Sequence, residues 1–336
     1  MRPMAKPTGG FRAALPIGWA ALGAAGLLYA RFRSIPSWAA LPALAAFLVE
    51  YPFYLVPAFP SVRQRVAGAR LPLFLAASTA LPYLTWKLVQ AAAFGGRGGH
   101  PFEWMALAQL LAVALALGLW YFVLPPSPLT DLGFGALVAW IVLGRYFDKI
   151  YPTPFHHVEI AYLGKIAVFQ AAVMVLMLVR RVPETGYGFI PRWKDWRIGA
   201  MNFLYFIPVG LPLGLAIKAV RFGPPAPLWF IAGTFLAMLW VLTLAEEFLF
   251  RGVLQPLMES WTHSSGAALL IASAVFGLAH LSFRRMFPNW RWVLVAGALG
   301  WFCGRARNQA GDIRAAMVTH TLAVTALRAF FVLGPQ

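Results

Sequence analysis

Long apolar runs follow one another along almost the whole sequence, and their length constrains the fold more than any other feature. Windows of about 19 residues identify about eleven runs, most of them near the roughly 20 residues that a helix needs to cross a bilayer. An outer-membrane barrel would instead show alternating segments of about ten residues, and the sequence has none. The pattern predicts an all-α fold, namely a polytopic transmembrane helical bundle of about 9–12 spans.

Composition supports a membrane location. Of the 336 residues, 60% are hydrophobic and only 12% are charged, whereas a soluble domain carries roughly 25% charged residues. The formal net charge is +17, and many basic residues lie between apolar runs, as in Arg63–Arg70 and Arg180–Arg197. Basic loops of this kind contact anionic lipids. We therefore expect a multi-pass protein of the cell inner (plasma) membrane, with anionic lipids and no nucleic acid as partners.

The longest polar interval, Arg180–Arg197, marks the predicted domain boundary. It contains helix-breaking residues, among them Gly186, Gly188 and Pro191. Ionisable residues within apolar runs are sparse before this interval and cluster after it. The sequence thus predicts an N-terminal transmembrane helical region of unknown role, residues 1–185, and a C-terminal region, residues 186–336, that carries the functional site.

The segment Leu244–Gln255 places three charged residues, Glu246, Glu247 and Arg251, inside an apolar run. An ionised side chain inside a bilayer costs from roughly 3 to above 10 kcal/mol, so these residues need partners or a purpose. On a helix, Glu247 and Arg251 are four residues apart and can pair, while Glu246 is rotated by about 100°. Either Glu246 performs chemistry while the pair supports it, or all three form a salt-bridged cluster that only locks helices together.

Two histidines lie in the apolar runs that follow. His280 is near the end of the run Ala267–Phe283, one turn after Phe276, and His320 is in the last run, after a polar turn over Arg305–Arg314. Either histidine alone is best explained by an interhelical hydrogen bond. Together with the glutamates they are residues suited to proton transfer near neutral pH, which favours a catalytic site.

In this order and at these spacings, Glu246-Glu247-x-x-x-Arg251, Phe276-x-x-x-His280 and His320 resemble the CaaX-protease-and-bacteriocin-processing (CPBP, or Abi) family of intramembrane proteases. The family includes type II CaaX prenyl endopeptidases, and the resemblance covers about residues 228–333. It implies a glutamate-dependent peptidase in which Glu246 activates water, His280 holds or polarises that water, and His320 lies beside the oxyanion. Glu247, Arg251, Phe276 and Asn308 would be supporting residues.

One position departs from the family pattern. The histidine that corresponds to His320 is usually followed four residues later by Asn or Asp, whereas this chain has Val324. A second hydrogen-bond donor would then come from Asn308, Thr321 or Thr325. Otherwise turnover is weak, or the chain keeps the fold without the activity.

No cofactor is expected, although a metal site is an alternative. Glu246, His280 and His320 could bind Zn²⁺ and leave a position for water, but the sequence has no His-Glu-x-x-His run. The single cysteine, Cys303, excludes internal disulfides and Cys-based metal sites, and we interpret it as a small packing residue. The stretch His156-His157-x-Glu159 is best explained as an interfacial loop.

The sequence therefore predicts an intramembrane endopeptidase that cleaves a membrane-associated or lipid-modified substrate with a glutamate-activated water. Its composition, rich in Ala, Arg and Gly, indicates a bacterial source, where prenylated CaaX proteins are generally lacking and another substrate is favoured. One alternative is a non-catalytic pseudoprotease, an immunity or assembly factor. Another is a proton-coupled transporter with Glu246, His280 and His320 as its relay.

Overall fold

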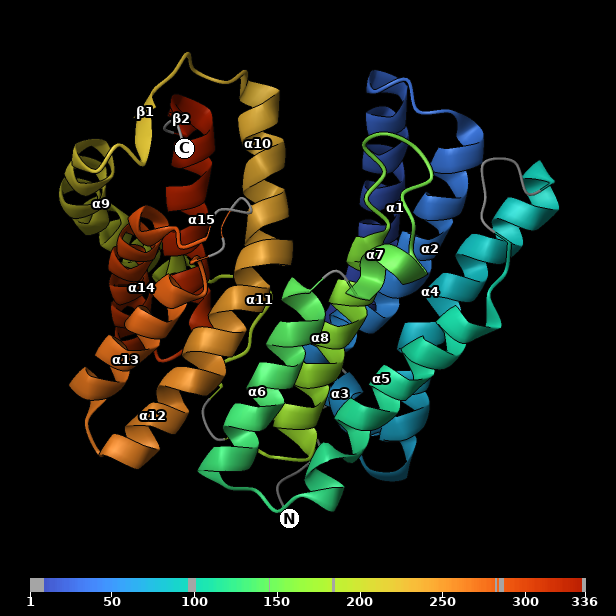
Figure 1. The fold of residues 1–336 in the computed structure, drawn as a ribbon, viewed down its shortest axis with the longest axis horizontal. Coiled ribbons are helices and arrows are strands. Elements are labelled where there is room, and N and C mark those ends of the chain that lie inside the picture. Colours follow the sequence, from blue (N-terminus) through green and yellow to red (C-terminus); the bar gives the residue numbers. More distant parts are fainter. Residues whose placement is uncertain are drawn as a thin grey trace. The chain divides into compact units, whose positions relative to one another are not determined.

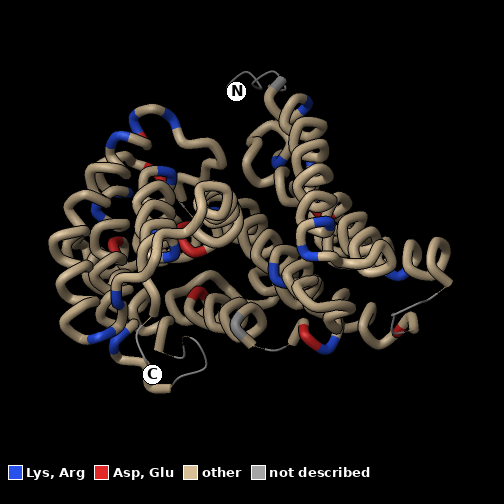
Figure 2. Tube along the Cα trace, turned by 90° about the horizontal axis from the view of Figure 1, so that it is seen from above, with Lys and Arg blue, Asp and Glu red and all other residues tan. Residues whose placement is uncertain are grey.

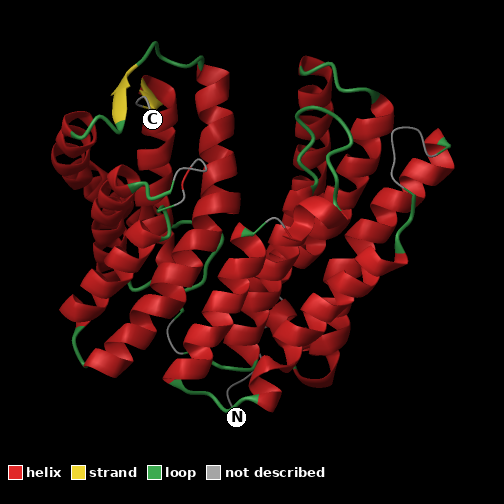
Figure 3. Cartoon of the chain, in the orientation of Figure 1, coloured by secondary structure: helices red, strands yellow, loops and turns green. Residues whose placement is uncertain are grey.

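The computed structural model describes residues 9–95, 101–144, 146–182, 185–281, 283 and 287–333. Residues 183 and 184 of the predicted boundary and residue 282 of the His280 run therefore lie outside the described residues. The chain forms two compact units, Met1–Arg181 and Val182–Gln336. Helices make up nearly all of the described structure (Figure 3), which confirms the predicted all-α fold.

Helices long and apolar enough to cross a membrane occur in both units, and charged residues are thinly spread along them (Figure 2). Within the described residues there are six: Gly10–Phe32, Ser37–Ala58, Trp104–Val123, Ala161–Leu178, Trp193–Ala216 and Leu228–Thr262. Two shorter apolar helices, Pro128–Val142 and Ser265–Leu278, accompany them. Each predicted apolar run contains a helix, and the protein is a multi-pass membrane protein.

The first unit is built around one central helix (Figure 1). In the most apolar 18-residue stretch of α8 (Ala161–Leu178), 72% of the residues are buried, compared with 6% in that of α1 (Gly9–Phe32). Arg180, just beyond α8, binds both oxygens of Asp131 at 2.8 Å, and Tyr121 donates to the same carboxylate at 2.8 Å. These contacts fasten the end of α8 to α6 and α5. The main helices of this unit are α1 (Gly9–Phe32), α2 (Ser37–Leu55), α4 (Leu71–Phe94), α5 (Trp104–Val123), α6 (Pro128–Leu143) and α8 (Ala161–Leu178), with the short helices α3 (Pro60–Arg63) and α7 (Tyr146–Ile150) between them.

In the second unit, α9 packs against α14 and α15, and α13 packs against α12 and α14. One continuous helix, Leu228–Thr262, carries both glutamates and includes two π-helical segments, Met238–Leu242 and Phe248–Leu254. The elements are α9 (Trp193–Ala216), β1 (Val220–Phe222), α10 (Leu228–Ala237), α11 (Thr243–Glu247), α12 (Gln255–Thr262), α13 (Ser265–Leu278), α14 (Trp290–Ala310), α15 (Ile313–Phe330) and β2 (Phe331–Leu333).

Two sequence-based boundaries were wrong. The last apolar run, predicted over Ile313–Leu333, does not stay helical to its end, because residues 331–333 form β2 and pair antiparallel with β1. The predicted polar turn over Arg305–Arg314 is helical as far as Ala310. The segment is mostly polar, but its alanine, arginine and glutamine residues have a high helix propensity. The real turn is at Gly311, whose φ of 80° suits glycine. Asp312 then caps α15 by accepting a hydrogen bond from the Arg314 amide at 3.0 Å.

Helices α13 and α14 approach closely because glycines lie where they cross. A Cβ added to Gly277 would lie 2.6 Å from the Val293 carbonyl oxygen and 3.1 Å from the Cα of Gly297. Both neighbours are backbone atoms, so the helices themselves would have to separate. Gly233, in α10, has open space around it, with nothing within 4 Å of an added Cβ.

These two helical glycines give a matched test of the packing. We expect Gly277→Ala to destabilise the protein by about 1–3 kcal/mol, because overpacking forces the backbone to shift. Gly233→Ala should stabilise it by up to about 1 kcal/mol through helix propensity alone. Thermal unfolding of the purified protein in detergent measures both. Equal effects of the two substitutions would contradict the close helix crossing.

Candidate active site

Glu247 and Arg251 form an ion pair within the glutamate-bearing helix. Arg251 Nε lies 3.3 Å from Glu247 Oε2, and Arg251 Nη1 donates to Oε1 at 3.3 Å. Both side chains are fully buried, with 0% of their surface exposed. The predicted pairing of these residues is confirmed. Because the two groups are buried together, each neutralises a charge that the interior could not otherwise tolerate.

The Arg251 guanidinium is also fixed by α13 and α14. Its Nη2 donates to the Gly300 carbonyl at 2.9 Å, and its carbon lies 4.4 Å from the centre of the Phe276 ring, a cation–π contact. A Cβ added to Gly300 would lie 3.0 Å from Nη2. Gly300 therefore leaves the room that the guanidinium occupies.

His320 reaches both glutamates from α15. Its Nδ1 lies 2.7 Å from Glu247 Oε1, and its Nε2 lies 3.7 Å from Glu246 Oε2. Since a carboxylate only accepts hydrogen bonds, the short contact assigns a hydrogen to Nδ1. The Phe276 ring meets the imidazole edge to face, with centroids 5.5 Å apart. The side chain of His320 is 3% exposed, so its orientation is set by these neighbours.

The two adjacent glutamates occupy different environments. Glu247 is fully buried and bound to Arg251 and His320. The side chain of Glu246 is 26% exposed, and its Oε2 has no hydrogen-bond partner in the part of the chain that the structure describes. One carboxylate is therefore held by two partners, and the other belongs to a partly exposed side chain whose buried Oε2 is free to accept a hydrogen bond.

His280 contacts the site through Phe276 and makes no direct contact with Glu246. Its Nδ1 is hydrogen-bonded to the Phe276 carbonyl at 2.9 Å, and its ring lies 4.9 Å from the Phe276 ring. That is the one polar contact of the His280 ring within the described residues. Phe276 thus packs against both histidines. Because the carbonyl accepts from Nδ1, the other ring nitrogen, Nε2, is left as an acceptor.

Asn308 is held through its Oδ1 by two partners, and no hydrogen bond joins it to either glutamate within the described residues. Its Oδ1 accepts from Gln255 Nε2 at 2.8 Å and from Arg307 Nη1 at 3.3 Å. Since α14 extends to Ala310, Asn308 lies on a helix and not in the predicted polar turn.

The threonines of α15 differ in their availability as donors. Thr243 Oγ1 lies 3.2 Å from the Leu239 carbonyl and 2.9 Å from Thr321 Oγ1. If Thr243 donates its one proton to the carbonyl, Thr321 must donate to Thr243, so both hydroxyl protons are used. Thr325 is buried, and its hydroxyl has no hydrogen-bond partner in the described residues. Val324, at the position that departs from the family, is half-buried and adds no donor.

Cys303 is a contact of the site that sequence reasoning missed. It is fully buried beside Leu299, Ala316 and Ala323, as expected for a packing residue. Its sulfur also lies within 4.8 Å of ligand atoms of Glu247 and His320. The signal in the sequence was its position three residues after Gly300 on the same helix, which places both on the face toward the ion pair.

The described residues gather a different metal-ligand set from the one that the sequence suggested. Ligand atoms of Glu247, Cys303 and His320 lie within 4.8 Å of one another. Among those same residues, Glu246, His280 and His320 do not converge in this way. The sequence argument excluded metal sites based on cysteine, whereas in the structure one thiol lies beside a carboxylate and an imidazole. His156 and His157 lie in an exposed loop.

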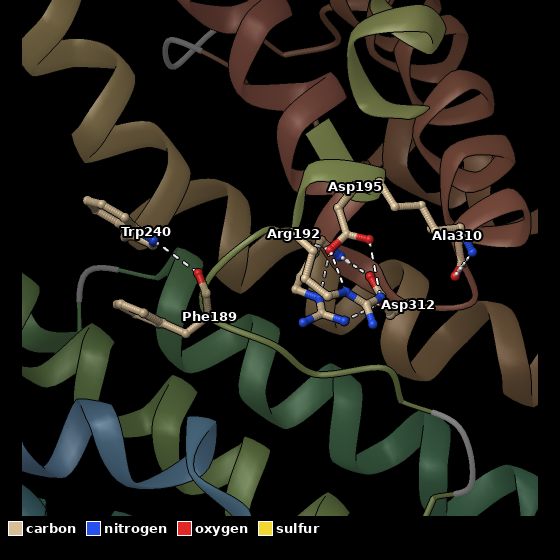
Figure 4. Close-up of polar contacts among 8 residues, drawn as sticks. Phe189, Arg192, Asp195, Trp240, Ala310 and Asp312 are labelled. Carbon is tan, nitrogen blue, oxygen red and sulfur yellow. Dashed lines mark hydrogen bonds and ion pairs between the residues drawn. The ribbon is translucent and has the colours of Figure 1, made fainter. Parts of the chain in front are cut away.

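An ion-pair network holds the start of α15 against the start of α9 (Figure 4). Asp312 Oδ2 lies 2.6 Å from Arg192 Nη2 and 2.6 Å from Arg314 Nη2. Asp195 Oδ2 lies 3.2 Å from Nε of each arginine. The aspartates are nearly or fully buried, so the arginines neutralise charges that water does not reach. The network fixes the helix that carries His320.

The segment before α9 is fastened along the glutamate-bearing helix. Trp240 Nε1 donates to the Phe189 carbonyl at 3.0 Å, and the two rings stack with centroids 5.7 Å apart (Figure 4). Tyr187 meets Phe248 edge to face at 5.3 Å, one residue after Glu247. The Ile313 amide donates to the Gly186 carbonyl at 3.3 Å. This segment therefore links the glutamate-bearing helix to the start of α15.

The buried pair predicts a specific pattern of stability changes. Arg251→Leu should destabilise the protein by about 3–5 kcal/mol, because it leaves the Glu247 carboxylate without its buried counter-charge. The double variant Glu247→Gln/Arg251→Leu should recover part of this loss. Arg328→Gln, at an exposed position of α15, is the control and should change stability much less. Thermal unfolding in detergent measures all three, and a double variant less stable than Arg251→Leu would contradict the pairing.

Comparison with known proteins places the site within a family. Residues 227–326 match the family described as Type II CAAX prenyl endopeptidase Rce1-like. No curated protein and no solved structure matches the chain. The matched segment begins just before α10 and ends within α15, so it contains both glutamates, Arg251 and both histidines. The match to residues 227–326 of this multi-pass membrane protein therefore supports the CPBP/Rce1-like family that the order of the motifs led us to expect.

Proposed function

We propose that the C-terminal unit hydrolyses a peptide bond in a membrane-associated or lipid-modified protein, with Glu246 as the base that activates water. The observation that carries this proposal is the difference between the two glutamates. Glu246 has an accessible side chain and an unpartnered Oε2, whereas Glu247 is fully buried and bound by Arg251 and His320. The Rce1-like match supports a peptidase at the level of the family.

The attacking water would lie between Glu246 and His280. A general base must be within hydrogen-bond reach of the proton that it removes, and Oε2 of Glu246 is free to accept that bond. His280 Nδ1 is occupied by the Phe276 carbonyl, so Nε2 is the atom that would accept a hydrogen bond from the other O–H of the water. Glu246 would then pass the abstracted proton to the leaving amine.

His320 would supply the donor for the oxyanion. Nδ1 is used by Glu247, so the donor is Nε2, on the side of Glu246. Donation from both nitrogens requires the imidazolium form. The charges of two carboxylates, one guanidinium and one imidazolium sum to zero, and a net charge of zero suits a buried site. A preorganised donor of this kind is often the largest single contribution to catalysis.

The supporting residues act by keeping His320 and Glu246 in position. Arg251 and Glu247 orient the imidazole, and Phe276 packs between the two histidines. No cofactor takes part in this scheme. We further propose that the protein acts in the cell inner membrane among anionic lipids.

A non-catalytic role is the second candidate, and one observation favours it. Val324 provides no donor at the position where the family has Asn or Asp, and the hydroxyl of Thr321 is already hydrogen-bonded to Thr243. A pseudoprotease, for example an immunity or assembly factor, could keep this geometry without turnover.

Comparing protein termini in membranes of the native host separates the two candidates. Wild-type protein should generate new C-terminal fragments that are lost with Glu246→Gln at equal expression, since loss of a general base lowers the rate by about 10²–10⁴-fold. Unchanged termini, together with a Glu246→Gln variant that still supports the phenotype of the cell, would favour the pseudoprotease.

The lack of a hydrogen-bond donor at position 324 predicts that a substitution there can raise activity. Removal of one oxyanion donor from a protease costs about 10²–10³ in kcat, so we expect Val324→Asn to raise kcat by at least roughly tenfold. Ala326→Asn, on another face of α15, is the matched control. Turnover of one substrate by the purified variants measures the effect. Equal rates for the wild type and Val324→Asn would show that the site already has a second donor.

A further inference from the structure

We propose that Glu247, Cys303 and His320 form a binding site for a thiophilic divalent cation, such as zinc or cadmium, and that the bound cation inhibits the enzyme. The binding follows from the three side chains alone. The inhibition rests on the proposed function. This inhibitory set is different from a catalytic zinc at Glu246, His280 and His320.

Three donor types meet from three separate helices. Glu247 contributes a carboxylate oxygen from α11, Cys303 a sulfur from α14 and His320 an imidazole nitrogen from α15. Their ligand atoms already lie within 4.8 Å of one another. Ligands around a tetrahedral zinc ion, at bond lengths near 2.0–2.3 Å, are roughly 3.5 Å apart. A contraction of about an ångström would therefore complete the set.

An unsatisfied group at the site points to a ligand. Glu247 Oε2 is fully buried and has no hydrogen-bond partner among the described residues; its contact with Arg251 is an ion pair at 3.3 Å. Glu246 lies on the other side of the imidazole, with its Oε2 3.7 Å from His320 Nε2, and is not one of the three ligands.

The charge of the site matches a divalent cation. The two glutamates and a Cys303 thiolate contribute three negative charges, and Arg251 contributes one positive charge. The sum is −2 when His320 is neutral, so a divalent cation makes the buried site neutral. Binding would release two protons to solvent, one from the thiol and one from the imidazolium. The thiolate is the soft ligand, so the site should prefer zinc or cadmium to magnesium or calcium.

Occupancy would remove the groups that the proposed reaction needs. A cation bound through His320 Nδ1 would replace the hydrogen bond to Glu247 that orients the imidazole, so Nε2 would no longer be held toward the oxyanion. The same cation draws the Glu247 carboxylate away from Arg251, which then loses its counter-charge. The expected result is an enzyme that binds the cation and stops turning over.

Cadmium binding to the purified full chain in detergent tests the site directly. We expect the ultraviolet absorption of a cadmium–thiolate bond to rise until about one ion is bound per chain, and to be lost in Cys303→Ala and Cys303→Ser. Cys303→Ser keeps the size and the hydrogen-bond donor, so its folded state can be checked by thermal unfolding. The double variant His156→Ala/His157→Ala, in the exposed loop, should retain the signal. No thiolate absorption with the wild-type protein would overturn the proposal.

Inhibition is measured on the same preparations, with each variant compared with its own metal-free rate. Half-inhibition by zinc should need at least about tenfold more metal in Cys303→Ser than in the wild type, since even changes around a metal ligand cost about 10–100-fold in affinity. Magnesium at the same concentrations should not inhibit. Equal zinc sensitivity of the wild type and Cys303→Ser would refute the inhibitory role. If the wild-type protein shows no peptidase activity, the proposed function fails while the absorption signal still decides whether the site exists.

Discussion

A guanidinium in the interior of an apolar bundle needs a counter-charge, and the pairing of Arg251 with Glu247 is the interaction on which the candidate site depends. Neither side chain has any exposed surface. Breaking such a pair leaves an uncompensated buried charge, which costs far more than the net value of the pair. Glu247 also anchors His320 at 2.7 Å. The buried pair therefore determines where the imidazole lies, and the imidazole in turn lies beside Glu246.

The remainder of the second unit brings the helices to that point. Gly277 and Gly300 allow α13 and α14 to come close to each other and to the guanidinium. The network of Arg192, Asp195, Asp312 and Arg314 fixes the start of α15, and α15 runs antiparallel to the glutamate-bearing helix from there. Small residues and polar contacts are the usual means of helix association in membranes, where apolar side chains gain little by leaving lipid. The site is thus a product of packing between helices that are far apart in the sequence.

Much of the fold could be predicted because membrane-spanning helices have a length and a composition that are visible in the sequence. The Glu247–Arg251 pair was also predictable, since it depends only on helical spacing. The different environments of Glu246 and Glu247 could not be derived in that way, because two π-helical segments interrupt the helix and exposure depends on α13 and α15. Cys303 was missed for a similar reason: its contact with Glu247 is made between helices. The helical residues Arg305–Ala310 were misassigned because polarity was taken to indicate a turn.

The central claim is that two neighbouring carboxylates have separate tasks, and paired measurements on Glu246→Gln and Glu247→Gln test it most directly. Unfolding midpoints and cleavage rates would be recorded on the same purified preparations. Our account predicts that Glu246→Gln keeps the midpoint of the wild type and loses cleavage. Glu247→Gln should lower the midpoint, because Arg251 is left without its counter-charge. Identical behaviour of the two variants in both measurements would contradict the separation and leave a single salt-bridged cluster as the better description.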